Sequence, residues 1–454
     1  MEQIRKILSI FHDTINEIES LSDYYYRSNK TLISYRTEVE KNYSSGKKLA
    51  DIFDDLFLLD SAEERNKRIE EIKDFQIDEN TKIQDVCEIL PFKKDNQTTI
   101  SFTLKSHMSN IENLDPKKAK QKYEHIERYE YIFVESILSH IIVSFESFLS
   151  NVYKSRLMAS PQKYLEGQTI PLAAIFSDSI NDTIYDKLEN EIASKMYDSL
   201  STIKWIAEKE QISIDKYQTI ANDFKEIYYR RNAYVHTKGR VNRDYLKKVD
   251  KRWTKGKEID DVLVCDDVYL KNAICVFSQI VFSVTFELLK KEKADENAIS
   301  VVANYYFEKL INGEYQLAKY VYGSLSTYNS MRFSERLMYR INFIIAAKQL
   351  QETGLVKHEL EKLDVSATES QFKIAKECLG ENFGKVFDML NETYPDSFCA
   401  WAIKEWPIFI DFRNTDYYKE FIELHKEDFK IQQIDDNESQ IDELLEKVVS
   451  ENCD

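Results

Sequence analysis

The chain has 454 residues, of which only nine are glycine and six are proline, while 43% are hydrophobic. This length suits two or three domains, and the shortage of glycine argues against a glycine-rich loop that binds nucleotide phosphates. The formal net charge of −17 excludes a protein that coats nucleic acid with its whole surface. Long stretches of Leu, Ile, Glu and Lys at helical spacing predict an all-α fold.

The first predicted domain, residues 1–119, is a mostly helical region to which the sequence assigns no function. An amphipathic helical pattern begins at Met1, so no signal peptide is expected. One polar, β-branched stretch, NQTTISFTL over residues 96–104, is interpreted as a short strand or a loop. Pro116 marks a boundary before the next helix.

The second predicted domain, residues 120–293, contains three helical patterns. The first includes residues 135–153, the last covers residues 269–291, and the middle one ends near His236. Pro161, Gly167 and Pro171 indicate an irregular insertion over residues 160–182. The most informative residues of the chain lie at the end of the middle helix.

These residues are Arg231, Asn232 and His236, in an R-N-x-x-x-H arrangement. An arginine stays cationic and forks onto phosphate oxygens, whereas a histidine gives or takes a proton near neutral pH. Together they suit the cleavage of a phosphodiester bond. We expect His236 to move protons, Arg231 to stabilise charge on the phosphoryl oxygens, and Asn232 to orient the imidazole or the phosphate.

The residues before this motif form one apolar stripe at helical spacing: Tyr217, Ile220, Phe224, Ile227 and Tyr228. The next position on the stripe is Arg231. A guanidinium on a buried face needs an acceptor, which is either a substrate phosphate or a structural carboxylate.

Arg231 and His236 are five residues apart, so they diverge on a straight helix. A site that contains both therefore needs a helix that bends or ends near Tyr234. The alternative is a second chain that donates the missing residue, which implies a homodimer.

At the motif the chain resembles the HEPN superfamily, helical bundles whose active members carry an arginine and a histidine with four to six residues between them. The segment Phe145, Glu146, Phe148 and Leu149 is similar to the core of the superfamily's first long helix. The resemblance covers roughly residues 120–293 and implies a HEPN-like helical bundle there.

The resemblance also implies an activity. Active members are metal-independent endoribonucleases in which the RNA 2′-OH attacks the adjacent phosphate, and many act as toxins or in antiviral defence. Arg231, Asn232 and His236 would be the catalytic residues, with Glu146 and Arg230 as candidate supporting residues. The alternative is a non-catalytic HEPN-like protein that dimerises and recruits a partner through its C-terminal helices.

A basic segment surrounds the motif. Residues 225–257 contain twelve Lys or Arg against three acids, a net charge of +9 within an acidic chain. Phosphate neutralisation supplies much of the affinity for RNA, so this segment is the predicted RNA-binding surface, although a solvated lysine-rich loop has the same composition. The candidate RNA-binding residues are Lys238, Arg240, Arg243, Lys247, Lys248, Lys251 and Arg252.

The third predicted domain, residues 296–454, is a series of amphipathic helices that ends in an acidic tail. The segments around Tyr315 and Phe383 resemble the first helix of a tetratricopeptide repeat, and they lie 68 residues apart, twice the 34-residue repeat. The unit between them matches poorly, so helical hairpins of another kind remain an equal alternative. We expect a sensing or interaction domain for a protein partner or trigger ligand, or else a capping domain that stabilises the dimer.

No cofactor or metal is expected, because the seven histidines do not have metal-ligand spacing and no phosphate-binding loop is present. The six cysteines form no C-x-x-C pair and no disulfide pattern, which favours reduced thiols in the cytoplasm. The longest apolar stretch, residues 274–289, is interrupted by polar side chains, so no membrane span is expected.

Overall fold

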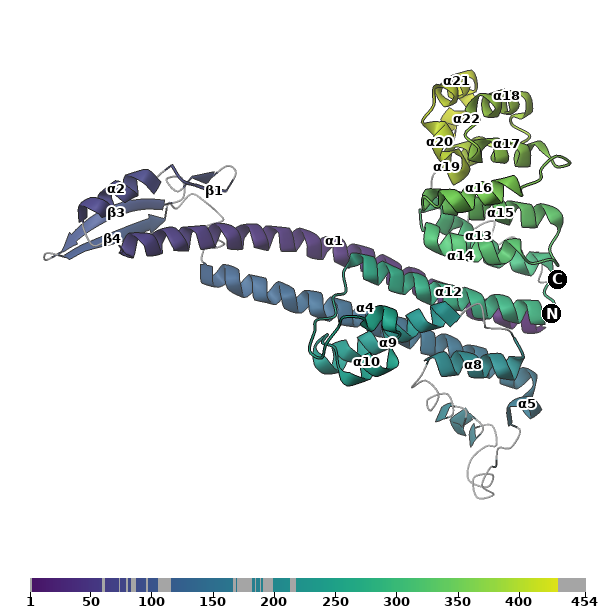
Figure 1. Cartoon of the computed structure of the whole chain (residues 1–454), viewed down its shortest axis with the longest axis horizontal. Coiled ribbons are helices and arrows are strands. Elements are labelled where there is room, and N and C mark those ends of the chain that lie inside the picture. The colour runs from purple at the N-terminus through teal and green to yellow at the C-terminus, as the bar shows by residue number, and fades with distance from the viewer. Residues whose placement is uncertain are drawn as a thin grey trace. The chain divides into compact units, whose positions relative to one another are not determined.

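A computed structural model describes residues 2–58, 62–72, 74–78, 81–82, 87–94, 97–104, 116–165, 199–212 and 218–431, with short pieces between 169 and 190. The described chain is mostly helical, which confirms the predicted class (Figure 1). Of the predicted insertion over residues 160–182, the structure describes residues 160–165, 169 and 182, and the rest lies outside the described residues, as do Tyr217 and the acidic tail beyond residue 431.

Two antiparallel β-hairpins interrupt the helices of the N-terminal region. One pairs β1 (Gln76–Asp78) with β2 (Thr81–Lys82), and the other pairs β3 (Cys87–Lys94) with β4 (Gln97–Leu104). The stretch for which a strand or a loop was predicted is therefore a strand from residue 97. Its alternation of Thr and Ser with Ile and Phe has the two-residue period of a strand.

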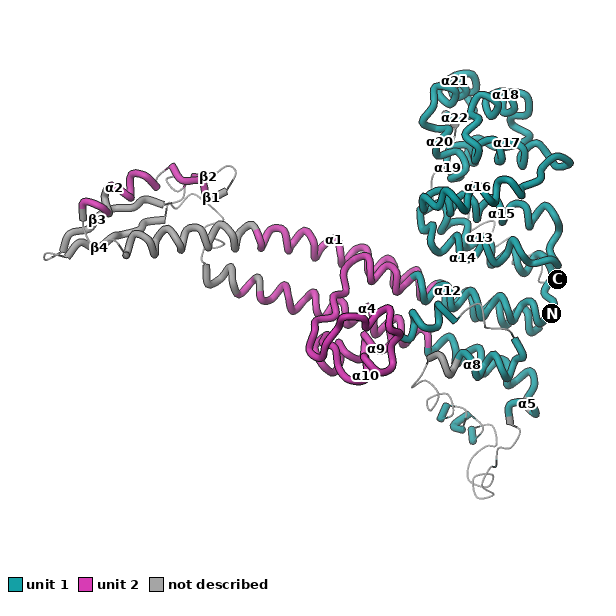
Figure 2. The backbone as a smooth tube through the Cα atoms, in the orientation of Figure 1, with its two compact units in different colours: residues 1–15, 146–225, 275–454 teal, residues 16–145, 226–274 magenta. Residues whose placement is uncertain are grey.

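The chain forms two compact units, each assembled from distant segments (Figure 2). One unit contains residues 1–15, 146–225 and 275–454, and the other contains residues 16–145 and 226–274. The helices that contribute to both are α1 (Glu2–Leu58), α4 (Pro116–Ala159), α9 (Gln218–Thr237) and α12 (Asp267–Lys291). The units therefore interleave along the sequence, unlike the three consecutive ranges predicted from it.

In the unit of residues 16–145 and 226–274, α1 and α4 pack against each other. Tyr25 is buried and stacks on Phe133, with 6.1 Å between the ring centroids. Arg36 Nη1 donates to both carboxylate oxygens of Glu130, at 2.9 and 3.1 Å. This unit also contains α2 (Ala62–Ile72) and two short helices that follow α9, α10 (Arg243–Lys248) and α11 (Lys251–Thr254).

In the other unit, most of α12 forms a core helix. The ring of Phe282 is fully buried and meets Tyr306 edge-on, with centroids 5.4 Å apart. Two short helices, α5 (Pro161–Leu165) and α8 (Ser199–Glu210), lie in the same unit. Buried Arg156 donates to Glu210 and Glu292, at 2.9 and 2.7 Å.

Two described helical stretches are long and apolar enough to cross a membrane by length and composition alone, Glu124–Ala159 and Asp267–Lys291. In the second, 83% of the apolar window is buried within the protein, as in the core helix of a globular domain.

A series of helical hairpins follows α12 in the same unit. The three complete hairpins pair α13 (Glu296–Ile311) with α14 (Tyr315–Ser326), α15 (Phe333–Gln349) with α16 (Thr353–Glu361), and α17 (Ser370–Leu379) with α18 (Phe383–Thr393). The remaining elements are α19 (Ala400–Glu405), η3 (Pro407–Phe409), α20 (Ile410–Arg413), α21 (Asp416–Leu424) and α22 (Lys426–Ile431).

The three hairpins share one turn geometry. Each turn places a single residue in the left-handed region, Gly313, Gln351 or Glu381, with φ of 81°, 60° and 60°. After each of them the next backbone N–H donates to the carbonyl five residues earlier, at 2.9 to 3.0 Å. The three turn residues are 38 and 30 residues apart. The middle turn thus lies four residues later than an even 34-residue spacing would place it. This displacement explains why the sequence of the middle unit fits the 34-residue pattern poorly.

Ion pairs connect each hairpin to the turn of the next one. Lys319 of α14 contacts Glu352 at 2.5 Å, and Lys348 of α15 contacts Glu381 at 2.9 Å. Both glutamates lie beside or at the left-handed residue of their turn. The array is therefore connected mainly between neighbours.

We predict that Gln351→Gly stabilises the hairpin array by up to about 1 kcal/mol, because glycine adopts a positive φ without steric strain. Equilibrium urea unfolding measures the change. The matched control is Gly313→Ala in the equivalent turn, which should destabilise the array by about 1 kcal/mol. A Gln351→Gly variant that is less stable than the wild type would contradict the strain argument.

Candidate functional site

The motif helix α9 ends at a glycine whose backbone conformation the packing requires. Gly239 has φ of 71°, and its N–H donates to the carbonyl of Ala233 at 3.0 Å. A Cβ atom at this position would lie 3.2 Å from the ring of Tyr234. Glycine is therefore the residue that terminates α9 here without strain.

The helix remains α-helical through the whole motif. A helix that ends near Tyr234 would have allowed Arg231 and His236 to meet within one chain. Instead, α9 continues to Thr237. On a regular helix, Arg231 and His236 point ~140° apart. Asn232 and His236, four residues apart, share a face.

The structure corrects the position of the apolar stripe. Arg230 is 4% exposed, whereas Tyr228 and Arg231 are half-buried. The stripe therefore continues from Phe224 and Ile227 to Arg230, and the expectation that Arg231 occupies the buried position is wrong. Tyr228 misled the sequence interpretation because an aromatic side chain at the margin of a buried face has the same spacing as one at its centre.

Arg230 is held in a buried cluster around Glu226, whose side chain is fully buried. Arg230 Nε donates to Glu226 Oε1 at 2.7 Å, and Arg230 Nη1 donates to the carbonyl of Val264 at 2.6 Å. The guanidinium also lies over the ring of Tyr269, 4.1 Å from its centroid. The structural carboxylate considered for the motif arginine thus exists, but it pairs with Arg230.

Two tyrosines complete this cluster. The hydroxyls of Tyr245 and Tyr269 donate to Glu226 at 2.5 and 2.7 Å. Burial, together with the carboxylate, raises the pKa of Tyr245 and of Tyr269. Burial alone would lower the pKa of Arg230, but Tyr269 and Glu226 raise it above its ordinary value. The carboxylate therefore faces protonated phenols and a charged guanidinium at neutral pH.

Arg231 has different surroundings. Its Nη1 donates to Asn232 Oδ1 at 3.0 Å, and its Cζ lies 5.4 Å from the centroid of the Tyr228 ring. Its Nε is buried and has no hydrogen-bond partner in the described part of the chain. No carboxylate among the described residues pairs with this guanidinium, so its charge remains available to an anion.

His236 is exposed in the last turn of α9, and among the described residues it makes no hydrogen bond. Its neighbour Val235 is 42% exposed. Asn232, expected to orient the imidazole or the phosphate, instead accepts a hydrogen bond from Arg231. One chain therefore presents a half-buried guanidinium without a carboxylate partner and an exposed imidazole on different sides of α9.

The remaining candidates occupy α4. Glu146 is half-buried there. His140 of the same helix is exposed. The residue that sequence reasoning missed is Glu226, although its i, i+4 spacing to Arg230 is a common signal for an ion pair on a helix.

The basic segment after the motif is a folded element and not a solvated loop. Asn242 caps α10 by accepting from the N–H of Tyr245 at 2.9 Å. The backbone N–H of Leu263 donates to Gly239 at 2.8 Å, which closes the base of the segment. Tyr245 and Leu263 are fully buried.

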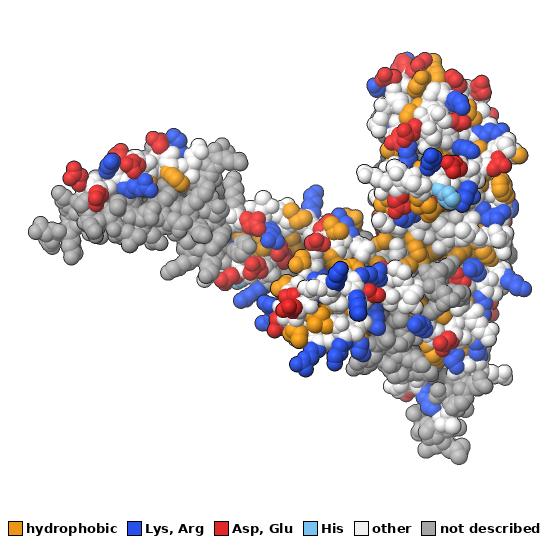
Figure 3. Space-filling view, in the orientation of Figure 1, with side chains coloured by type: hydrophobic (Ala, Val, Ile, Leu, Met, Phe, Trp, Pro, Cys, Tyr) orange, Lys and Arg blue, Asp and Glu red, His pale blue; other side chains and the backbone are white. Residues whose placement is uncertain are grey.

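All seven candidate RNA-binding residues on this segment are exposed. In Figure 3 Lys and Arg side chains gather over α10 and the chain beside it. Arg240 donates to a backbone carbonyl, that of Asp260. Six of the seven make no ion pair with a described carboxylate: Lys238, Arg240, Arg243, Lys247, Lys248 and Lys251.

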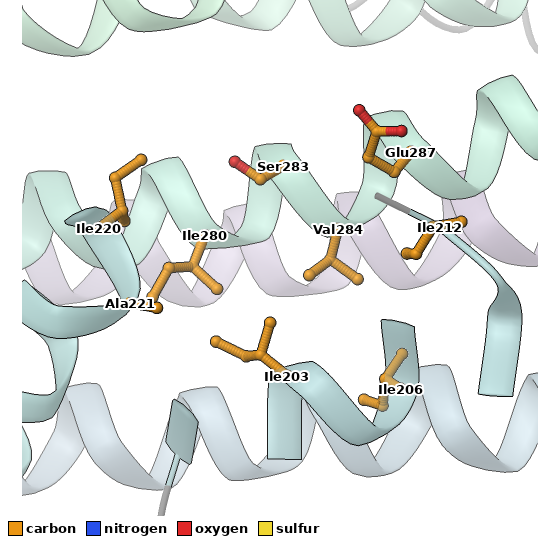
Figure 4. Close-up of a pocket in the computed structure, with 9 residues that line it drawn as sticks. All are labelled: Ile203, Ile206, Ile212, Ile220, Ala221, Ile280, Ser283, Val284 and Glu287. Carbon is orange, nitrogen blue, oxygen red and sulfur yellow. The ribbon is translucent and has the colours of Figure 1, made fainter. Parts of the chain in front are cut away.

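A small pocket lies elsewhere, among α8, the start of α9 and α12 (Figure 4). Its volume is about 20 Å³ and its walls are mainly isoleucine side chains. Glu287 lines it, but the carboxylate contacts Lys290 at 2.9 and 3.0 Å. The pocket has the character of imperfect core packing. The part of the chain that the structure describes contains no cluster of three or more metal-ligating side chains.

No known protein family, curated protein or solved structure matches this chain. We therefore infer its function from the residues of the site itself.

We predict that Glu226→Gln destabilises the protein by about 3 kcal/mol, because it leaves the buried guanidinium of Arg230 without its countercharge. Chemical denaturation measures this loss. Hydrogen exchange at the amides of Val241 and Leu263, which close the basic segment, should accelerate.

Arg231→Ala serves as the control. Arg231 is half-buried, and its buried Nε has no hydrogen-bond partner in the described structure, so its removal relieves an unfavourable desolvation free energy of about 1–3 kcal/mol. The stability of this variant should equal or exceed that of the wild type. If the two variants lose equal stability, the distinction between the two arginines is wrong.

Proposed function

We propose that this protein is a metal-independent endoribonuclease of the HEPN type, with Arg231, Asn232 and His236 as its catalytic residues. The observation that carries the proposal is that the Arg231 guanidinium has no carboxylate partner among the described residues, on the same helix as an exposed histidine and next to a folded, basic segment. Arg230, in contrast, is paired with Glu226 and with the backbone carbonyl of Val264. An arginine without a carboxylate partner suits a phosphate.

In the proposed reaction the RNA 2′-OH attacks the adjacent phosphorus, a new P–O bond forms, and the bond to the 5′-oxygen breaks. His236 would move the proton from the nucleophile or to the leaving oxygen. Arg231 would stabilise the negative charge that develops on the non-bridging oxygens. The products would be a 2′,3′-cyclic phosphate and a 5′-hydroxyl. DNA lacks the nucleophile and should resist cleavage.

The proposed active species is a homodimer. Arg231 and His236 diverge on one continuous helix, so a complete site needs residues from two chains. Exposed aliphatic side chains on the same unit support self-association, since Ile132 and Val143 of α4 are 57% and 61% exposed. Val235, between the motif residues, is exposed as well.

We further propose that the tetratricopeptide-like hairpins bind a protein partner or trigger ligand, and that the enzyme acts in the cytoplasm as a toxin or antiviral-defence effector. The packing of helices α13 to α18 against one another supports a stacked array with an extended binding surface. The alternative, a non-catalytic dimer that recruits a partner through the same array, predicts no cleavage by the wild-type protein.

We predict that His236→Ala and Arg231→Ala each reduce RNA cleavage by roughly 10²–10⁴-fold without unfolding the protein. The assay uses purified protein and total RNA in the presence of a chelator, followed by mapping of the ends for cyclic phosphate. If both variants cleave RNA like the wild type, Arg231 and His236 are not catalytic residues and the proposed function is wrong.

Mixing these two inactive variants tests the shared site. If Arg231 and His236 come from different chains, mixed dimers rebuild one intact site, and activity should return to up to about a quarter of the wild-type level. A site within one chain shows no recovery.

We predict that reversing Lys247, Lys248, Lys251 and Arg252 to Glu weakens RNA binding and lowers its dependence on salt, because fewer counterions are released. Fluorescence anisotropy at several salt concentrations measures both quantities. Cleavage of a dinucleotide, which spans only the motif, should change much less. The control reverses four exposed cations outside this segment: Lys357, Lys362, Lys385 and Lys419.

A further inference from the structure

Two side chains contact the guanidinium of Arg231: the ring of Tyr228, and the amide oxygen of Asn232 at Nη1. Tyr228 lies three residues earlier on α9, with its ring centroid 5.4 Å from the guanidinium carbon. Asn232 accepts from Nη1 at 3.0 Å. These two contacts restrict both the position of the guanidinium plane and its rotation within that plane.

The same contacts leave part of the guanidinium without acceptors. Nε is buried and unpaired in the described structure, and Asn232 engages only Nη1. A buried donor without an acceptor costs about 1–3 kcal/mol, so the arrangement does not serve stability. A guanidinium that is already oriented can bind a phosphate with less loss of side-chain entropy.

We infer that Tyr228 is a positioning residue for the proposed ribonuclease reaction, in which its aromatic face holds Arg231 in the orientation that binds the scissile phosphate. This inference rests on the proposed function of the motif. Tyr228 touches Arg231 and acts through it. The ring face, not the hydroxyl, makes the contact.

The test compares three substitutions at this position. Y228F and Y228W keep an aromatic face and should retain kcat within about twofold, whereas Y228L removes the face and should lower kcat about tenfold. KM for a long RNA should stay nearly constant, because the basic segment provides most of the affinity. The matched control is Y229L, which alters the next half-buried tyrosine of the same helix.

A double-mutant cycle separates positioning from general damage. In the Arg231→Ala background, Y228L should lower the residual rate by less than about twofold, because the residue through which it acts is gone. An equal loss in both backgrounds would overturn the inference. So would a Y228F variant as impaired as Y228L, since that result would assign the effect to the hydroxyl.

A spectroscopic measurement extends the test to binding alone. In arginine-labelled protein titrated with inorganic phosphate, the Nε–H signal of Arg231 should shift, and the apparent affinity should fall about tenfold in Y228L. An unchanged phosphate affinity in Y228L refutes the positioning role. If the wild type binds phosphate through Arg231 but does not cleave RNA, the proposed function fails while the positioning role stands.

Discussion

The buried ion pair between Glu226 and Arg230 is the interaction on which the candidate site depends. Three donors converge on one carboxylate that has no access to water, and the arginine that it holds reaches the backbone of Val264. These bonds fix α9 to the segment that carries the exposed lysines and arginines. Removal of either partner would leave an uncompensated charge in the core, so the pair acts as a geometric constraint more than as a source of net stability.

This constraint gives two adjacent arginines opposite properties. Arg230 is saturated with acceptors and has no capacity for another ligand. Arg231, one residue later and ~100° around the helix, is left with an orphaned donor and no carboxylate. Two identical side chains thus differ because one faces the core and the other lies at its margin. A sequence motif specifies only the type of residue, so it does not distinguish a buried, paired arginine from a half-buried one without a carboxylate.

The sequence predicted the helical class because glycine and proline are scarce, and it located the motif at the end of a helix. It also placed the helices of residues 135–153 and 269–291, which lie within α4 and α12. It did not predict the direction of the motif side chains, because the partners of Glu226 lie 19 and 43 residues away, in Tyr245 and Tyr269. Spacing along one helix contains no information about such distant partners.

The same limit applies to the C-terminal hairpins. A fixed 34-residue period locates the first and third hairpins but misses the middle one, because its turn is displaced by four residues. The hydrogen-bond geometry of the turn is preserved although the spacing is not. The same turn also follows α8 and α12, at Gln211 and Lys293, so it marks the end of a helix and not a repeat unit.

The ion pairs between successive hairpins have a mechanical consequence. Lys319 and Lys348 each join one hairpin to the turn of the next, at positions partly open to solvent. Salt screens such pairs over a distance of about 8 Å at physiological ionic strength. The hairpins are therefore joined both by apolar packing, as between Tyr322 of α14 and Tyr339 of α15, and by ion pairs that salt weakens. In concentrated salt the array should bend more readily with every hairpin still folded.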